Sequence, residues 1–190
     1  MLRRTPWSKY GGTPPPFEIV KARDLGHVPD DIHLSPLPAG VDMYSGLGIP
    51  AGSTILSPDH LEVLSFPLHP MIHLILFFTN THPMQLNPNS YLIMSTFLAL
   101  GLKLGVSLGF RDFLYLFDLT VIKGETSFFN FKPRYRKKFL SLGPSRARDW
   151  KNRPLLISGN WKAPELSQLS IPSAFGPKPG IYKFTFIIFL

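Results

Sequence analysis

The sequence predicts a compact, mainly α-helical domain with a small β-hairpin, an α+β fold, between irregular proline-rich flanks. Two observations lead to this prediction. The chain holds 20 prolines in 190 residues, yet none falls between Asn89 and Lys132, so this is the one long window for uninterrupted helix. After Leu119 the helical period gives way to an aromatic run at 128–131, which is typical of a strand.

Composition limits the classes of protein that the chain can form. Apolar residues make up 44% of the sequence, which is enough for one core. The absence of cysteine excludes a disulfide scaffold, thiolate metal sites and cysteine nucleophiles. The N-terminus is positively charged but lacks the apolar stretch of a secretory signal, so we expect an intracellular location, in the nucleus or cytoplasm.

We divide the chain into three regions. Residues 1–58 are rich in proline and glycine without a sustained period, so they are expected to be irregular, with a short strand at 17–20. Residues 59–162 form the predicted domain. Residues 163–190 are expected to be a Pro/Ser-rich linker followed by an apolar tail. The Gly46-Leu47-Gly48 triplet lacks the third glycine of a dinucleotide-binding loop and is predicted to be a turn.

The first helix of the domain is predicted to open at Pro67 or Pro70 and to reach about Thr79, because proline suits the first helical turn. His69 and His73 then lie on one face, with the spacing of a helical zinc pair. A zinc-peptidase motif also needs glutamate directly after the first histidine, where this chain has proline. We therefore interpret both as surface or capping histidines.

A pair of helices is predicted inside the proline-free window. Asn87 or Asn89 can cap the first of them, and Pro88 has no N–H group to leave unsatisfied. Gly105 is predicted to end this helix, and the short connection predicts that the two helices pack together. The apolar stripes are predicted to be Leu92, Ile93, Phe97, Leu100 and Leu104 in the first helix and Phe110, Phe113, Leu114 and Phe117 in the second.

An alternative treats residues 92–110 as one membrane span. Its ten Leu, Ile, Val and Phe residues would contribute about −3 to −6 kcal/mol to insertion. Lys103 near the centre costs about +2.5 to +3.5 kcal/mol, so insertion is close to balance. Because Gly105 followed by Ser107 fits a helix break, we favour the helix pair and keep a membrane-associated protein as an alternative.

The positive charge is concentrated in one part of the chain. Residues 1–122 have 7 Lys and Arg against 9 Asp and Glu, a net charge of −2. Residues 123–162 have 11 against 2, a net charge of +9, and residues 163–190 have a net charge of +1. A local concentration of this kind indicates a polyanionic partner more strongly than the same charge spread evenly.

Basic and aromatic residues alternate between the aromatic strand and a second predicted strand at 155–158. Such a segment can hold a nucleic-acid backbone while a ring stacks on bases, so DNA or RNA is the expected partner. The alternative is a solvated turn between two paired strands, with the rings of Tyr135, Phe139 and Trp150 in the core, and for the rings we favour it. The candidate nucleic-acid-binding residues are Lys132, Arg134, Arg136, Lys137, Lys138, Arg146, Arg148, Lys151 and Arg153.

Several short motifs occur in an order that resembles a known family. They include Gln-Leu-Asn-Pro-Asn at 85–89, the aromatic run at 128–131 and Trp-Lys-Asn-Arg at 150–153. The order resembles the plant domain called the putative gypsy-type transposase domain, found in proteins derived from long-terminal-repeat retrotransposons. The resemblance covers about residues 60–160. It implies a retrotransposon origin, and the family name does not imply a demonstrated reaction.

No set of side chains predicts a reaction. A transposase needs carboxylates that converge on divalent metal, whereas Asp112 and Asp118 lie about 240° apart around a helix. We expect no cofactor, no metal site and no small-molecule substrate. The leading hypothesis is a transposable-element-derived, non-enzymatic domain that acts by protein or nucleic-acid contact, including self-association. A metal-dependent nuclease or strand transferase is the alternative.

Overall fold

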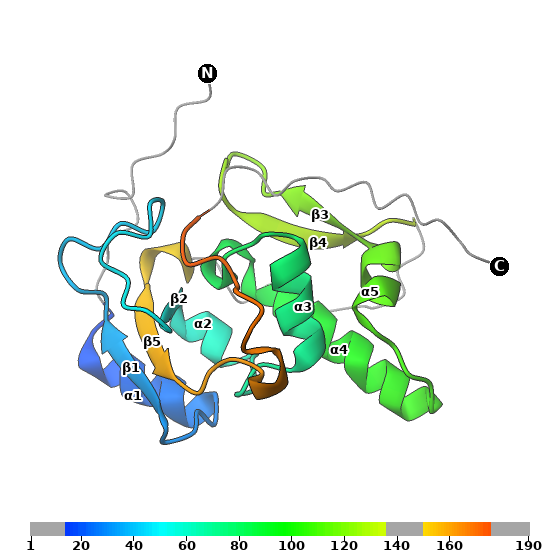
Figure 1. Cartoon of the computed structure of the whole chain (residues 1–190), viewed down its shortest axis with the longest axis horizontal. Coiled ribbons are helices and arrows are strands. Elements are labelled where there is room, and N and C mark those ends of the chain that lie inside the picture. The colour runs from blue at the N-terminus through cyan, green and yellow to red at the C-terminus, as the bar shows by residue number, and fades with distance from the viewer. Residues whose placement is uncertain (1–13, 136–149, 176–190) are drawn as a thin grey trace.

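The computed structural model describes residues 14–135 and 150–175 and contains helices and two antiparallel sheets (Figure 1). The α-helices are α1 (Pro16–Leu25), α2 (Pro58–Leu61), α3 (Pro70–Phe78), α4 (Pro88–Leu104) and α5 (Phe110–Leu116). The strands are β1 (Ile32–Pro36), β2 (Thr54–Leu56), β3 (Phe117–Val121), β4 (Phe129–Pro133) and β5 (Leu155–Gly159). Short 3-10 helices lie at η2 (Pro83–Gln85), η3 (Trp150–Asn152) and η4 (Pro164–Leu166).

The architecture is a mixed α+β arrangement with 38% helix and 18% strand. The prediction of a mainly α-helical domain with a small β-hairpin was therefore wrong. The strands β3 and β4 form a hairpin, and β1, β5 and β2 form a separate sheet with β5 in the centre. This sheet was missed because its strands come from distant parts of the chain, and a local period in the sequence does not predict which strands pair.

The three-stranded sheet joins the N-terminal region to the rest of the protein. Ile32 of β1 lies opposite Gly159 of β5, and Thr54 of β2 lies opposite Ile157. The strand predicted at 155–158 is thus confirmed, and its continuous apolar run suits a central strand that is covered on both faces. The expectation that residues 1–58 are irregular was wrong for α1, β1 and β2, and the core continues across position 58.

Gly159 is required by the close approach of β1 and β5. Its φ angle is +97°, in the region that favours glycine, and a Cβ atom there would collide with the carbonyl oxygen of Asp31. Gly40 also has a positive φ, of +83°, but no heavy atom lies within 4 Å of its would-be Cβ. A side chain at Gly40 would therefore meet only an unfavourable backbone conformation, whereas a side chain at Gly159 would also meet a steric clash.

The strand predicted at 17–20 is a helix, so this prediction was wrong. Prolines precede and open α1, where the missing N–H group costs no helical hydrogen bond. At the other end Arg23 donates hydrogen bonds to the carbonyl oxygens of Val28 (3.2 Å), Pro29 (3.0 Å) and Ile32 (2.5 Å). These bonds hold α1 against the start of β1, a tertiary contact that residues 17–20 do not reveal.

The second sheet is the β3–β4 hairpin, in which Phe117 lies opposite Pro133 and Val121 opposite Phe129. Gly124, with a φ angle of +84°, lies in its turn. The alternative that pairs the aromatic strand with the strand at 155–158 was wrong, because β4 pairs with β3. The nearer partner in sequence is β3, and a short turn brings β3 and β4 together at lower entropic cost.

The helix pair and its ends are confirmed. The Asn87 side chain caps α4 by accepting a hydrogen bond from the backbone N–H of Asn89 (2.9 Å), and Gly105 ends α4 in the left-handed conformation with a φ angle of 65°. The helix predicted from Pro70 to about Thr79 is α3. Within the described residues no helix is long and apolar enough to cross a bilayer, and α4 ends inside the span considered at 92–110.

The buried face of α4 differs from the predicted stripe. Phe97 is buried as expected, but Leu92 is 37% exposed and Leu104 is 62% exposed. The stripe that faces the core consists of Ser90, Tyr91, Met94, Phe97 and Gly101. Apolar residues lie almost all round this helix, so the sequence period does not select a face, and packing against β4 does.

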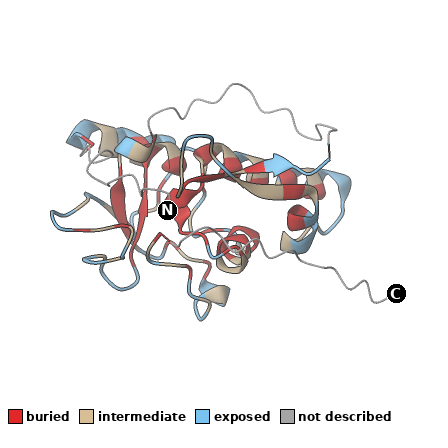
Figure 2. Ribbon diagram, turned by 90° about the horizontal axis from the view of Figure 1, so that it is seen from above, coloured by how far each residue is buried: buried red, intermediate tan, exposed pale blue. Residues whose placement is uncertain are grey.

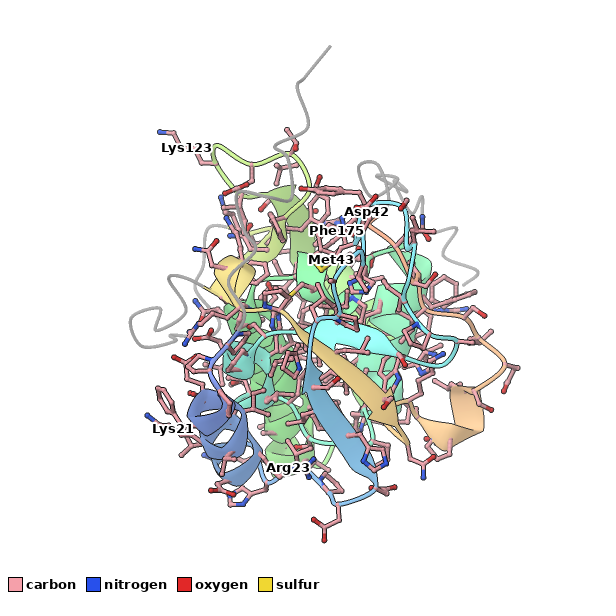
Figure 3. The ribbon with its side chains drawn as sticks, turned by 90° about the vertical axis from the view of Figure 1, so that its left-hand side faces the viewer. Lys21, Arg23, Asp42, Met43, Lys123 and Phe175 are labelled. Atoms are coloured by element: carbon pink, nitrogen blue, oxygen red, sulfur yellow. The ribbon has the colours of Figure 1, made fainter. Side chains whose placement is uncertain are left out.

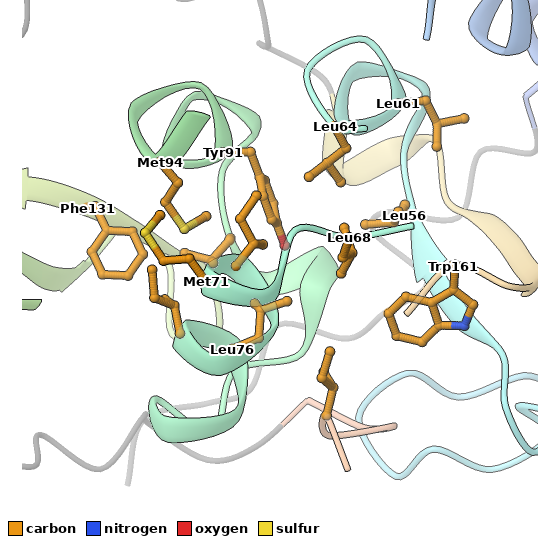
Figure 4. Close-up of a cluster of buried hydrophobic side chains, with 14 of the residues drawn as sticks. Leu56, Leu61, Leu64, Leu68, Met71, Leu76, Tyr91, Met94, Phe131 and Trp161 are labelled. Carbon is orange, nitrogen blue, oxygen red and sulfur yellow. The ribbon is translucent and has the colours of Figure 1, made fainter. Parts of the chain in front are cut away.

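Buried residues occupy the inner sides of the helices and strands, and exposed residues gather in loops such as 38–40 and 105–107 (Figure 2). The larger cluster draws on both sheets and on the helices between them. Figure 4 shows its centre, where Tyr91 and Met94 of α4 lie near Met71 of α3 and Phe131 of β4. One continuous core therefore supports the helices and both sheets.

Residues 163–175, expected to be part of a linker, pack onto the body instead. The side chains of Ala163, Ile171 and Phe175 are buried, and the backbone N–H of Phe175 donates to the carbonyl oxygen of Met43 (2.7 Å). Figure 3 shows Phe175 next to Met43, in a second cluster that includes Trp150. The apolar tail predicted at 181–190 lies outside the described residues.

Candidate nucleic-acid interface

The hairpin β3–β4 positions the first two candidate cations. Side chains alternate along β4, so Phe129 and Phe131 face the core while Lys132 and Arg134 lie on the exposed side. The Arg134 guanidinium donates one hydrogen bond to the carbonyl oxygen of Leu114 (3.2 Å) and forms an ion pair with Asp118 of β3 (2.9 Å). Arg134 is therefore held in place by the end of α5 and by β3.

The last two candidate cations are also held by carboxylates. Lys151 of η3 lies 2.5 Å from a carboxylate oxygen of Glu125 in the hairpin turn. Arg153 forms ion pairs with Asp59 of α2 (2.7 Å) and with Glu18 of α1 (3.4 Å). Both side chains are mostly buried, so these pairs tie the start of β5 to three other elements.

Trp150, directly before Lys151, packs in the core and so anchors this segment. The Trp150 side chain is 1% exposed and its ring makes edge-on contacts with Phe128 (5.0 Å between centroids) and His60 (5.2 Å). The prediction that this ring serves the core is confirmed for Trp150. Tyr135, by contrast, lies on the surface and contacts Tyr115, and Phe139 lies outside the described residues.

The structure thus divides the nine candidate cations into groups. Lys132 and Arg134 are exposed, and Arg134 is ion-paired with Asp118. Lys151 and Arg153 are half-buried and face three carboxylates, a structural role that their sequence positions do not reveal. Their acidic partners lie up to 135 residues away in the chain, so a local sequence pattern could not predict these ion pairs. The other five, Arg136, Lys137, Lys138, Arg146 and Arg148, lie outside the described residues.

Tyr115 is a surface residue of this region that the sequence reasoning missed. It follows Arg111 by one turn of α5, and the side chains of both are exposed. Its contact with Tyr135 arises because β3 begins directly after α5 and returns as β4. The spacing of Arg111 and Tyr115 on one helix face was the available signal, but the pairing with Tyr135 depends on the hairpin register.

A second polar cluster lies in the interior, around His60. The His60 Nε2 atom lies 2.8 Å from the carbonyl oxygen of Leu86, which can only accept, so Nε2 carries the proton. Its Nδ1 atom therefore accepts, from the backbone N–H of Ser57 (3.1 Å) and from the Ser57 hydroxyl (2.8 Å). Ser57 and His60 are both fully buried, so this hydroxyl–imidazole pair is a satisfied core network that solvent does not reach.

His82 belongs to the same interior region. Its Nδ1 atom accepts from the backbone N–H of Met84 (3.0 Å), and its own backbone N–H donates to the Gln85 side chain (3.0 Å). Burial lowers the pKa of His60 to about 4, although the hydrogen bond to Leu86 opposes this. Burial, with the nearby His60, lowers the pKa of His82 to about 3. Both imidazoles are therefore neutral in the folded protein at neutral pH.

The Gln-Leu-Asn-Pro-Asn block at 85–89 connects this interior to the hairpin. The Gln85 side chain donates to the carbonyl oxygen of Ser127 (2.9 Å). The backbone N–H of Asn87 donates to the carbonyl oxygen of Phe129 (2.9 Å). One residue beyond the block, the Ser90 hydroxyl accepts from the backbone N–H of Phe131 (3.1 Å). The block therefore docks β4 against the start of α4, which is a structural role.

The predicted histidine pair has two different environments. His69 is exposed and caps α3 by accepting from the backbone N–H of Met71 (3.1 Å), as predicted. His73 is buried, and its Nε2 atom donates to the carbonyl oxygen of Leu169 (2.9 Å), so the prediction of a surface or capping role was wrong for His73. The segment around Leu169 covers it, and that segment was expected to be a linker.

The two carboxylates considered for metal-dependent chemistry have structural partners. Asp112 accepts a hydrogen bond from the backbone N–H of Gly109 (2.9 Å) at the start of α5, and Asp118 pairs with Arg134. Across residues 14–135 and 150–175, no group of three or more His, Cys, Asp or Glu side chains is placed to hold a metal ion.

Residues 55–121 match the family model described as a putative gypsy type transposon. The matched segment runs from β2 to the end of β3 and includes α2 to α5. This match confirms the resemblance to gypsy-type transposon proteins over these residues. The basic segment 132–153 lies beyond the match. Neither the comparison with curated proteins nor the comparison with solved structures found a match.

Proposed function

We propose that this protein is a transposable-element-related, non-enzymatic binding domain that contacts nucleic acid through its basic segment, residues 132–153. The observation that supports this proposal most directly is the charge distribution. Residues 123–162 have a net charge of +9, whereas residues 1–122 have a net charge of −2. A local field of this sign attracts the phosphate backbone and raises the rate of encounter with it.

The segment has ion-paired cations at its ends and five further cations between them, and this arrangement suits binding. The described cations at its two ends include three that are held by carboxylates, and these fasten the segment to the body. Residues 136–149 between them carry five Lys and Arg against one Asp, a net charge of +4. Fastened ends reduce the chain entropy that binding must overcome.

The environments of the polar side chains support a non-enzymatic role. Asp112 and Asp118 accept hydrogen bonds within the fold, and the Ser57–His60 pair is buried. A general base must come within hydrogen-bond reach of a substrate proton, and the buried pair has no such access. Binding therefore accounts for more of this chain's charge and geometry than catalysis does.

Fluorescence anisotropy with labelled DNA and RNA tests the proposal. Affinity should fall as salt is raised from about 50 to about 200 mM, because bound phosphates release counterions. If all five cations of 136–149 contact phosphates, the slope of log K against log salt should reach about −4.5 for duplex DNA and about −3.5 for single strands.

A matched pair of double variants tests the site. The variant Lys137→Gln/Lys138→Gln should lose about two of the phosphate contacts, so its salt slope should become shallower by about 1.4 to 1.8. The control Lys21→Gln/Lys103→Gln removes the same charge from exposed positions on α1 and α4 and should keep the slope. Figure 3 shows Lys21 on α1. Absence of salt-dependent binding, or an equal loss in the control, would refute the proposal.

A further inference from the structure

Two exposed tyrosines lie together at the edge of the proposed interface. The ring centroids of Tyr115 and Tyr135 are 6.1 Å apart with an angle of 52° between the planes. Tyr115 is 50% exposed and Tyr135 is 43% exposed, so each ring keeps much of its area open to solvent. Exposed aromatic rings at a basic surface are the usual elements of a base-stacking site.

The backbone holds these rings in register. The backbone N–H of Arg134 donates to the carbonyl oxygen of Leu116 (2.8 Å), which extends the pairing of β3 and β4 beyond Phe117 and Pro133. Tyr135 is therefore brought to the last turn of α5, where Tyr115 lies. Figure 1 shows α5 at the end of this hairpin. Tyr115 thus lies on a helix, and Tyr135 lies two residues beyond the end of β4, next to the hydrogen bond between Arg134 and Leu116.

Among the described residues, Arg111 and Arg134 lie close to the two rings. Arg111 lies one turn before Tyr115 on the same exposed face of α5. Lys132 is exposed on β4, and Arg134 is fixed between Leu114 and Asp118. A strand whose bases reach the rings would have Arg111 near its phosphates, while Asp118 offsets the charge of Arg134.

The ionisation state of Tyr135 also suits an anionic partner. A hydrogen bond with Tyr115 raises the pKa of the Tyr135 hydroxyl above its ordinary value, and desolvation adds to this. The hydroxyl is neutral at physiological pH, as that of an unperturbed tyrosine also is, so it does not repel phosphate. A neutral phenol also keeps its π face available for stacking on a base.

We propose that Tyr115 and Tyr135 form a stacking platform for unpaired bases, so that this protein binds single-stranded nucleic acid in preference to duplex. The inference rests on the proposed function and adds the class of partner. Bases in a duplex are stacked on one another and offer no face to a protein ring, whereas bases in a single strand do. Phosphate contacts alone would not distinguish the two as strongly.

The full chain should be tested by anisotropy with a labelled pyrimidine single strand and with a duplex of the same length. The variants Tyr115→Leu and Tyr135→Leu remove one ring each, and the control Phe17→Leu removes a ring that is 68% exposed on α1. Each tyrosine variant should bind the single strand about 5- to 150-fold more weakly, the range that loss of one stacked base produces. Duplex affinity and the control should not change, and Tyr135→Phe should keep single-strand affinity.

The outcomes separate this inference from the proposed function. If wild-type protein binds both nucleic acids equally, with a salt slope that depends on Lys137 and Lys138, the stacking platform is refuted and the proposed function stands. Equal weakening of single-strand and duplex binding in the leucine variants would also refute the platform. If neither nucleic acid binds, both proposals fail.

Photocrosslinking provides a measurement that does not need a substitution. A single strand that contains 5-iodouracil should crosslink to the peptide with Tyr115 or to the peptide with Tyr135. Crosslinks confined to other peptides would overturn the inference even if a leucine variant failed to fold.

Discussion

Acidification from pH 7 to pH 5 is expected to destabilise the protein through His60 and His82. An unfolded histidine has a pKa of about 6.5, whereas burial lowers the folded pKa to about 4 for His60 and to about 3 for His82. As the pH falls below about 6.5 the unfolded state binds a proton at each histidine and the folded state does not. The free energy of unfolding therefore decreases, and the decrease ends only when each folded pKa is passed.

The magnitude follows from these pKa values. Between pH 7 and pH 5 the linkage relation gives a loss of about 2 kcal/mol from each histidine, or about 4 kcal/mol together. A typical domain is stable by only about 5–15 kcal/mol. The geometry explains why the folded state resists protonation. A proton on His60 Nδ1 would face the Ser57 N–H group that now donates to it.

Urea unfolding at pH 7 and at pH 5 measures this loss, and the NMR signals of the histidine rings give the folded pKa values. The variant His82→Gln should be less stable at pH 7 and should lose about half of the pH dependence. The control His33→Gln changes an exposed histidine of β1 and should keep all of it. Equal free energies of unfolding at both pH values, or His60 and His82 signals that titrate near pH 6.5, would refute the reasoning.

Five substitutions test the packing and the helix cap by urea unfolding. Gly40→Ala should lower the free energy of unfolding by about 1–2 kcal/mol, because of its positive φ alone. Gly159→Ala should lower it clearly more, because its methyl group also collides with the main chain. Equal losses for the two variants would contradict this. Met94→Ala should cost about 2–5 kcal/mol and Leu92→Ala less than about 1 kcal/mol, and the reverse order would restore the predicted stripe. Asn87→Ala should cost about 1 kcal/mol by removing the α4 cap, and an unchanged midpoint would show that the cap is dispensable.

The helix boundaries could be predicted because capping is a local property. Asn87 accepts from a backbone N–H two residues away, and Gly105 takes the left-handed conformation that other residues resist. The face of α4 could not be predicted in the same way. Leu92 and Met94 are both apolar, and only the position of β4 decides which of them is buried.

The candidate interface shows the same division. The concentration of positive charge is visible in the sequence, because it depends only on which residues are neighbours in the chain. Whether a cation faces solvent or a carboxylate depends on distant segments, as the pairing of Arg153 with Glu18 and Asp59 shows. The contact between Tyr115 and Tyr135 likewise depends on the register of β3 with β4.

By itself, the sequence determined the ends of the main helices, the concentrated positive charge and the resemblance to gypsy-type transposon proteins. Capping, net charge and short motifs are properties of neighbouring residues, so they need no tertiary structure. Only the tertiary structure decided that β5 pairs with β1 and β2 and that three predicted cations are ion-paired. Pairing between distant segments is selected by the packing of the whole core, and a local pattern contains no information about that packing.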